Sequence, residues 1–434
     1  MFSSSSQVEL FDFLSASPTA WHGVDAMAAR LDAAGFTRLE ESRAWSLEAG
    51  GRYYCVRDDG ALAAFRLPAG QLTSLRMIGA HTDSPALRLK PQPVQGGHGG
   101  HQLGVEVYGG ALLAPWFDRD LGIAGRVYVR TEGGRLERRL LHIDRPLAVI
   151  PSLAIHLDRE ANSSRSYNAQ TQMAPVFALG DGDAPSIESL IQRWLAEQHG
   201  LEEADVVDFE LNLCDVQPPT RSGLDGELIS SARLDNLLSC WCGMEALIAA
   251  DGEQGALLIA NDHEEIGSGT AGGAQGTLLN DVVARLAESR GEGGAAEGRI
   301  RLLQSSRLVS CDNAHAVHPG WPDKHDAQHR PRLNGGPVIK VNASQRYATS
   351  AATGALFRDI CRHADVPVQT FVSRADMPCG STIGPLSATR SGVPTLDIGI
   401  AQWAMHSIRE TAGAHDPDYL KRALTAFCNR DLLD

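Results

Sequence analysis

The sequence of 434 residues lacks any apolar run of the roughly 18 residues that a membrane-spanning helix needs. Basic residues are also scarce, because 39 Lys and Arg are outnumbered by 53 Asp and Glu, which gives a net charge of −14. A chain without a basic excess cannot neutralise many phosphates, so we expect no nucleic-acid partner and no membrane partner. The first stretch of the chain has acidic residues and no early Lys or Arg, so we expect no export signal.

Paired cysteines and two common catalytic motifs are missing as well. The eight cysteines are scattered, and none forms a C-x-x-C pair. This pattern is typical of free thiols in a reducing compartment, so we expect a cytoplasmic enzyme. The sequence contains neither a Walker A motif nor the nucleophile motif G-x-S-x-G.

Hydrophobic periodicity at the two ends of the chain predicts alternating helices and strands. Near the N-terminus the expected helices cover 7–14 and 24–34, and the expected strands cover 53–57, 61–66 and 75–80. From residue 235 onward the expected helices are 236–249, 278–288, 354–364 and 418–429, and the expected strands are 255–260, 307–311, 368–371 and 394–398. The alternation predicts an α/β fold with a mixed, mostly parallel sheet flanked by helices.

The middle of the chain has a different pattern. Between residues 91 and 230 the expected elements are mainly strands, with one helix over 187–197. The Gly- and His-rich stretch 95–101 predicts a flexible loop near the start of this region. We therefore expect an inserted β-rich domain over 91–230, within a first domain made of 1–90 and 231–434.

Candidate metal ligands follow several of the expected strands. The carboxyl ends of parallel strands meet at one edge of a sheet, where ligands bind. All of the candidates are nitrogen or oxygen donors, which suits Zn²⁺, Mn²⁺ or Co²⁺. They are His81, the pair Glu264 and Glu265, Asp312, His406, and Asp235 just before a helix.

Within the segment His81-Thr82-Asp83, the first and third residues can form a supporting pair. Residues two apart on a strand share a face, so Asp83 can accept a hydrogen bond from the His81 ring nitrogen that is not on the metal. This bond would fix the tautomer and orientation of the imidazole. The alternative is an ordinary core histidine beside an aspartate in a turn.

The adjacent carboxylates Glu264 and Glu265 are a stronger signal. Two neighbouring carboxylates at a strand end cannot both be buried unless a cation offsets their charge. One can bind metal while the other takes a proton from water. A solvated acidic loop is the alternative, although the apolar strand before the pair and the glycines after it favour a functional role. Gly267 rules out the zincin motif H-E-x-x-H, and the acidic pair would repel the pyrophosphate of a dinucleotide.

Many blocks in order along the chain resemble the aspartyl aminopeptidases, which are co-catalytic two-zinc exopeptidases. The matching blocks are SPTAWH at 17–22, HTDSP at 81–85, GVEVYGG at 104–110, WFDRDL at 116–121, HIDRPLAVIPSLAIHLDR at 142–159, ARLDN at 232–236, NDHEEIGS at 261–268, DNAHAVHP at 312–319, GPVIKVNASQRYATS at 336–350, PCGSTIGP at 378–385 and MHSIRE at 405–410.

This resemblance implies a zinc-exopeptidase catalytic domain with two zinc ions per subunit. One zinc would be held by His81 and Asp312 and the other by Glu265 and His406, with Asp235 bridging the two. Glu264 would be the general base that takes a proton from water and returns it to the leaving amine.

The same resemblance implies a substrate site for short peptides with an acidic N-terminus. Lys340 would capture the acidic side chain, with Tyr347 and His315 beside it. His156 would reach the active site from a neighbouring subunit, although it could instead be a further metal ligand.

The resemblance also implies that the insert is a dimerisation domain and that dimers build a dodecamer. Two other functions stay open at this point. A two-zinc amidohydrolase acting on N-acyl or carbamoyl amino acids would share the ligand layout. A self-assembling scaffold with structural metals belongs to another class, but it leaves Glu264 without a role.

Overall fold

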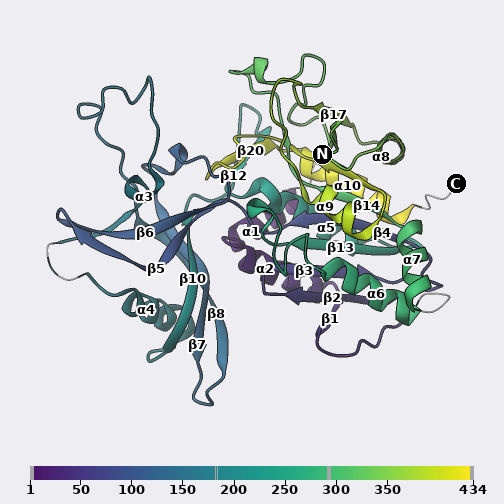
Figure 1. The fold of residues 1–434 in the computed structure, drawn as a ribbon, viewed down its shortest axis with the longest axis horizontal. Coiled ribbons are helices and arrows are strands. Elements are labelled where there is room, and N and C mark those ends of the chain that lie inside the picture. The colour runs from purple at the N-terminus through teal and green to yellow at the C-terminus, as the bar shows by residue number, and fades with distance from the viewer. Residues whose placement is uncertain (1–3, 181, 183, 291–294, 431–434) are drawn as a thin grey trace.

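The structure is a computed structural model that describes residues 4–180, 182, 184–290 and 295–430. In Figure 1 a nine-stranded sheet with its helices occupies one side of the molecule, and a six-stranded sheet occupies the other. A small five-stranded sheet completes the fold. The mixed α/β fold class predicted from the sequence is confirmed.

Parallel strands form the centre of the nine-stranded sheet. In spatial order the strands are β1 (Thr37–Arg38), β2 (Arg52–Arg57), β3 (Ala61–Arg66), β13 (Gly255–Asn261), β4 (Leu75–His81), β14 (Arg307–Cys311), β18 (Thr395–Gly399), β16 (Val338–Val341) and β17 (Gln369–Val372). The neighbours β13, β4, β14 and β18 all run parallel, whereas β3 and β16 run antiparallel to this central group. The carboxyl ends of the four central strands therefore open at one edge.

Helices cover both faces of this sheet. One face packs against α1 (Ser4–Ala16), α2 (Ala20–Ala33), α5 (Leu234–Ala249), α8 (Ala351–His363) and α10 (Asp416–Asn429). The other face packs against α6 (Leu278–Arg290) and α7 (Ala295–Ser305). Along β13, Leu258 belongs to the first core and Leu257 to the second, because successive side chains of a strand point to opposite faces. An uninterrupted apolar sequence is therefore what a strand buried on both sides requires.

Local signals set several helix boundaries. The Thr19 side chain accepts the backbone N–H of His22, so α2 begins at Ala20 and not at residue 24 as the periodicity predicts. Ser350 and Thr353 form a capping box at the start of α8. The shorter α9 (Ile383–Ser391) begins after Thr382, whose side chain accepts the backbone N–H of Gly384.

The six-stranded sheet is antiparallel throughout. Its strands, in spatial order, are β8 (Leu136–Ala148), β7 (Leu121–Arg130), β10 (Asp205–Asp215), β5 (Ala86–Gly97), β6 (Gly100–Tyr108) and β9 (Val176–Leu179). Helix α4 (Ile187–His199) packs on it through Ile191, Trp194 and Leu195, and α3 (Ala169–Gln172) precedes β9. The sheet spans residues 86–215, and the division of the chain at residues 91 and 230 stays a prediction.

The prediction of a flexible loop at 95–101 is wrong. These residues continue β5 into β6, and Gly97 pairs with Gly100 across a two-residue turn. The turn residues His98 and Gly99 both have positive φ, at 52° and 77°, as the favoured tight hairpin turns require. The glycines therefore mark a hairpin and not a loop.

The small sheet was not predicted because its strands have only two to four residues, too few for a periodic pattern. They are β11 (Thr220–Ser222), β12 (Leu228–Ser231), β20 (Glu410–Gly413), β19 (Ala401–Trp403) and β15 (Ala314–His315). Ser231 pairs with Glu410, and His315 pairs with Gln402. This sheet therefore joins segments that carry candidate site residues.

The two large sheets are tied together by ion pairs. Arg138 of β8 contacts Asp25 of α2 at 2.9 Å, and Arg126 of β7 contacts Asp59 at 3.4 Å. All eight cysteines are free, as the sequence predicts. Within the described residues, no helix combines the length and apolar character that crossing a membrane requires.

Candidate metal centre

Five segments that are distant in sequence meet at the carboxyl edge of the central strands. His81 ends β4, Asp312 follows β14, and Glu265 lies in a short 3₁₀ helix (Glu264–Ile266) just after β13. Asp235 lies at the start of α5, and His406 follows β19. The structure thus brings together all five side chains that the family resemblance implied as zinc ligands.

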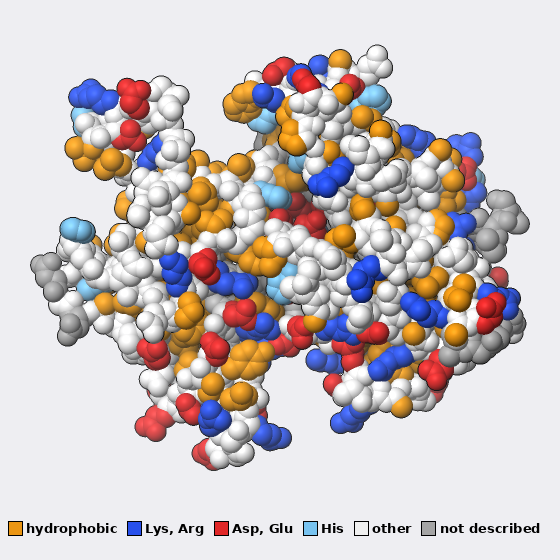
Figure 2. Space-filling model, viewed as in Figure 1, with side chains coloured by type: hydrophobic (Ala, Val, Ile, Leu, Met, Phe, Trp, Pro, Cys, Tyr) orange, Lys and Arg blue, Asp and Glu red, His pale blue; other side chains and the backbone are white. Residues whose placement is uncertain are grey.

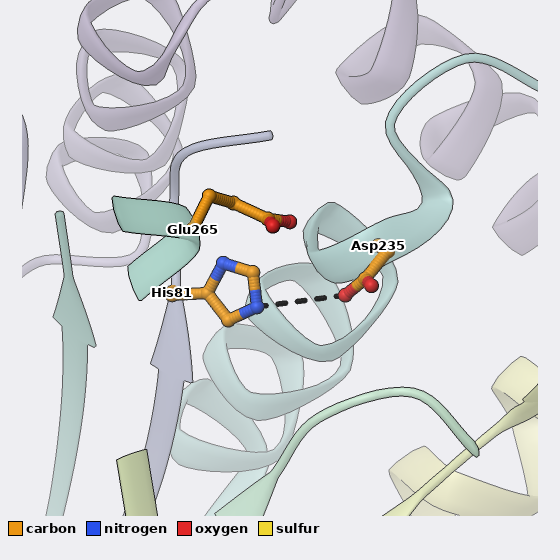
Figure 3. A group of neighbouring side chains, drawn as sticks. All are labelled: His81, Asp235 and Glu265. Carbon is orange, nitrogen blue, oxygen red and sulfur yellow. Dashed lines mark ion pairs between the residues drawn. The ribbon is translucent and has the colours of Figure 1, made fainter. Parts of the chain in front are cut away.

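Asp235 lies between two groups of side chains. Its Oδ1 is 3.5 Å from Nε2 of His81, which is also 3.8 Å from Oδ1 of Asp312. Its Oδ2 is 3.6 Å from Nε2 of His406, which is also 3.3 Å from Oε2 of Glu265. Each oxygen of one carboxylate therefore faces a different histidine–carboxylate pair. Figure 3 shows the Glu265 carboxylate above the His81 ring and the Asp235 carboxylate beside it, and ligand atoms of these three residues lie within 4.8 Å of one another.

Two buried oxygens of this cluster have no hydrogen-bond partner among the described residues. They are Oδ1 of Asp235 and Oε1 of Glu265. A buried carboxylate oxygen without a partner costs free energy unless something else binds it. Carboxylate oxygens and imidazole nitrogens at these separations are a donor set that zinc accepts. The residues therefore fit a metal centre.

Electrostatics in the cluster also favour a cation. Burial raises the pKa of Glu264 to about 8, and the nearby carboxylates of Asp312 and Asp235 act in the same direction. Burial and Asp235 raise the pKa of Glu265 well above its usual range. Burial alone would lower the pKa of His81, but its contacts with Asp235, Asp312 and Asp83 raise it well above 6.5. Without metal, the cluster therefore binds protons, and metal ions can displace these protons.

Asp83 supports the cluster from behind. Its carboxylate lies 3.4 Å from Nδ1 of His81, and it accepts the backbone N–H groups of Glu264 and Glu265 at 3.0 and 3.1 Å. Tyr108 donates its hydroxyl to the same carboxylate at 2.8 Å. Asp83 lies beyond the end of β4, so the irregular segment after the strand, and not a shared strand face, brings it to His81. The Asp83 carbonyl also lies 3.1 Å from that ring nitrogen. One carboxylate therefore positions three site residues.

Sequence reasoning missed Glu410, which lies on the opposite side of the cluster. It is almost completely buried, and it accepts the backbone N–H of Asp235 at 2.8 Å and that of His406 at 2.7 Å. In the sequence its only signal was its place at the end of the block MHSIRE.

A cavity of about 150 Å³ opens beside the cluster. Its lining includes Glu264, His315, Lys340 and Tyr347. Figure 2 shows acidic side chains in a recess near the centre of this face, with histidines close by.

Lys340 is buried, with its Nζ 3.9 Å from Oδ2 of Asp312 and 5.4 Å from the centre of the Tyr347 ring. His315 lines the cavity, and part of its surface is exposed there. Desolvation of the ring, together with the charge of Lys340, lowers the pKa of His315 to about 4.

His156 is not brought to this cavity within the chain. It is exposed in a segment, 151–168, that follows β8 and precedes α3. In Figure 1 this segment projects from the six-stranded sheet, away from the nine-stranded sheet. Its neighbours Leu153, Ile155 and Leu157 are also exposed, at 52%, 47% and 75%.

Comparison with known proteins gives relatives over nearly the whole chain. The chain is 52% identical over 423 residues to "Probable M18 family aminopeptidase 2" of Pseudomonas aeruginosa (strain UCBPP-PA14), covering 96% of each protein. It is 50% identical over 421 residues to the protein of the same description from Pseudomonas syringae pv. syringae (strain B728a), again covering 96% of each.

Solved structures of similar proteins share the fold. The chain matches a structure described as the cryo-EM structure of the Ape4 and Nbr1 complex with a TM-score of 0.93, 39% identity, and coverage of 97% of this chain and 84% of that one. It matches the S. cerevisiae mApe1 dodecamer with a TM-score of 0.84, 29% identity, and coverage of 97% and 95%.

A family model described as "Aminopeptidase I zinc metalloprotease (M18)" matches residues 13–428. The match favours a peptidase over the amidohydrolase and scaffold alternatives, and it confirms the family resemblance read from the sequence blocks. The chain belongs to the M18 family of zinc metallo-aminopeptidases.

Proposed function

We propose that this M18 aminopeptidase removes an N-terminal Asp or Glu from short peptides with the help of two zinc ions per subunit. The observation that carries the proposal is the position of Asp235, whose two oxygens face His81 and His406 separately. A carboxylate in this position suits a bridge between two metal ions, a common arrangement in two-metal peptidases.

In the proposed centre His81 and Asp312 hold one zinc, Glu265 and His406 hold the other, and Asp235 is shared. When bound, two zinc ions lower the pKa of a water molecule and polarise the scissile carbonyl. Mn²⁺ and Co²⁺ are possible substitutes, because they accept the same nitrogen and oxygen donors.

Glu264 is the proposed general base. Its carboxylate lines the cavity, and its backbone N–H is fixed by Asp83. It takes a proton from the attacking water and returns that proton to the leaving amine. Its pKa of about 8 in the absence of metal would fall beside two cations, which would leave it able to accept a proton at neutral pH.

Lys340 is the proposed determinant of the acidic preference. It is a buried cation on the wall of the cavity in a protein of net charge −14. Asp312 would share its charge with a bound zinc ion, and the ammonium group of Lys340, 3.9 Å from Asp312, would then be available to an acidic side chain of the substrate. Tyr347 and His315 complete this side of the cavity.

Assembly is part of the proposal because His156 lies outside the cavity of its own chain. One of the similar solved proteins, yeast mApe1, is described as a dodecamer. We propose that the inserted domain over 91–230 forms dimers of this chain, that dimers build a dodecamer, and that His156 enters the active site of a neighbouring subunit. The protein would act in the cytoplasm.

A substrate panel after metal removal tests the proposal. The chelated protein is assayed with chromogenic Asp, Glu, Ala, Leu and Lys derivatives after addition of Zn²⁺, Mn²⁺ or Co²⁺, and with N-acetylated Asp peptides as blocked controls. We expect activity to return with metal, to favour Asp and Glu, and to be absent on blocked substrates. Equal rates on all five residues would contradict the acidic preference, and light scattering tests the assembly separately.

A further inference from the structure

Glu410 is a buried carboxylate that has no place among the proposed zinc ligands or the substrate contacts. It lies at the start of β20 with about 1% of its surface exposed. A buried carboxylate is expensive unless it is fully hydrogen-bonded, so its partners indicate why this chain keeps it.

The partners of Glu410 are the backbones of two proposed zinc ligands. Its Oε2 accepts the N–H of Asp235 at 2.8 Å, and its Oε1 accepts the N–H of His406 at 2.7 Å. Asp235 is the carboxylate that both zinc sites share, and His406 belongs to the second site. Glu410 therefore fixes the main chain at two ligands that lie 171 residues apart (406 − 235).

A second link extends from Glu410 to the segment of Asp312. Gln402 donates to Oε1 of Glu410 at 3.3 Å, and its own side-chain oxygen accepts from Asn313 at 2.9 Å. Asn313 also donates to the backbone oxygen of Leu234 at 2.9 Å, next to Asp235. Three of the five proposed ligand segments are thus joined through Glu410, Gln402 and Asn313, all of them buried.

Glu410 and Asp83 support different members of the proposed metal centre. Asp83 contacts His81 and the backbone of Glu264 and Glu265 from one side. Glu410 contacts Asp235 and His406 from the other. The two carboxylate oxygens of Glu410 each face one N–H donor, whereas the amide of a glutamine would point an NH₂ group at one of the two donors.

We propose that Glu410 is a positioning residue that pre-organises both zinc sites through the Asp235 and His406 backbones. It does not touch the substrate or the reacting atoms. The inference rests on the proposed two-zinc centre, and it adds that the affinity for zinc depends on a residue outside the ligand set. Partners of this kind contribute about 10- to 100-fold in metal affinity in other proteins.

The test compares Glu410→Gln with a matched control, Asp416→Asn. Asp416 is equally buried and accepts two backbone N–H groups, from Asn334 at 2.7 Å and Gly336 at 2.9 Å, but these groups lie outside the metal cluster. Zinc affinity is measured by competition with a fluorescent zinc indicator, and melting temperatures are measured for the full chain with zinc and after chelation.

We expect Glu410→Gln to weaken zinc binding by about 10- to 100-fold and to shrink the gap in melting temperature between the loaded and chelated protein. Asp416→Asn should lower both melting temperatures together and leave zinc affinity unchanged. If Glu410→Gln behaves like Asp416→Asn, Glu410 is merely structural and the inference is wrong.

A wild-type protein that binds fewer than two zinc ions would overturn the proposed centre itself, which is a separate result. If Glu410→Gln does not fold, Glu410→Asp provides the milder test, since it keeps a carboxylate but shortens the side chain that spans the backbone N–H groups of Asp235 and His406. We expect a smaller loss of zinc affinity in that variant, and unchanged affinity would overturn the inference.

Discussion

Two regions of this molecule are proposed to serve one reaction, and they are built in opposite ways. The carboxyl edge of the nine-stranded sheet holds its charged side chains buried and cross-linked, with Asp83 and Glu410 each fixing more than one site residue. The segment 151–168 carries His156 and three apolar side chains into solvent.

The difference follows from what each region must do before a substrate arrives. A cluster of carboxylates can be buried only if its partners are fixed in advance, because an unpaired buried charge is costly. A histidine on an exposed apolar segment has no such requirement within its own chain. Its exposed neighbours are the kind of surface that a second subunit covers. The first region should therefore be complete within one chain, and the second should need an assembly.

The largest effect is expected at the carboxyl edge of the nine-stranded sheet. Glu264→Gln should lower kcat by up to about 10⁴-fold, because the amide cannot take the proton of the attacking water. Zinc content should stay at the wild-type level, since Glu264 is not among the proposed ligands. Single-substrate kinetics and metal analysis measure both quantities, and Glu253→Gln on the exposed surface is the control. Retained turnover in Glu264→Gln would remove the general base from the proposal.

The exposed segment provides the next test. His156→Ala should lower kcat by roughly 10²- to 10³-fold, the usual loss when one group that stabilises the transition state is removed. Co-expression of His156→Ala and Glu264→Gln chains should restore part of the activity, because some mixed sites combine an intact His156 with an intact Glu264 of another chain. If co-expression restores nothing, while each variant alone forms the normal assembly, His156 does not act between subunits.

A smaller effect, selective for acidic substrates, is expected from a change of Lys340 on the cavity wall. Lys340→Ala should lower kcat/KM on Asp and Glu substrates by about 10- to 100-fold, as expected for the loss of a charge-assisted hydrogen bond, and change it little on neutral ones. Lys324→Ala is the control, because Lys324 is largely exposed and lies outside this cavity. Equal losses of Lys340→Ala on acidic and neutral substrates would show that Lys340 serves the metal centre instead.

The smallest effect is expected in the pH dependence of stability, and it arises from the metal cluster at the carboxyl edge of the nine-stranded sheet. Glu264 has a pKa of about 8 in the folded metal-free protein against its ordinary 4.5, so the folded state keeps a proton that the unfolded state releases. The free energy of unfolding of the chelated protein should therefore fall as pH rises from about 4.5 to 8. The raised pKa of His81 acts in the same direction at the upper end of this range, because its contribution is lost as pH rises.

Zinc takes the place of these protons, so the zinc-loaded protein should not show this fall. The gap in melting temperature between the loaded and chelated protein should then widen by a few degrees between pH 5.5 and pH 8. Chelated Glu264→Gln should show a weaker dependence than the chelated wild type. A gap that narrows with rising pH would contradict the assigned protonation of the cluster.

Much of the site could be predicted because the ligands follow strands whose apolar character is plain in the sequence. His81 ends a buried parallel strand, Asp312 directly follows another, and Glu264 and Glu265 follow a third within four residues. Glu410 could not be found in this way, since its strand has four residues and its role depends on contacts with two distant backbones. The hairpin at 95–101 was missed because glycine predicts a break in a strand, whereas here it permits the positive φ of a tight turn.

By itself, the sequence determined the alternation of helices and strands, the family, and the residue types that can bind metal, because these follow from local periodicity and from short blocks of neighbouring residues. Only the tertiary structure decided that the two oxygens of Asp235 face different histidines, that Glu410 lies beneath two ligands, and that His156 stands apart from the cavity. These are relations between segments separated by tens to hundreds of residues, and they are set by the packing of strands and helices around a common core.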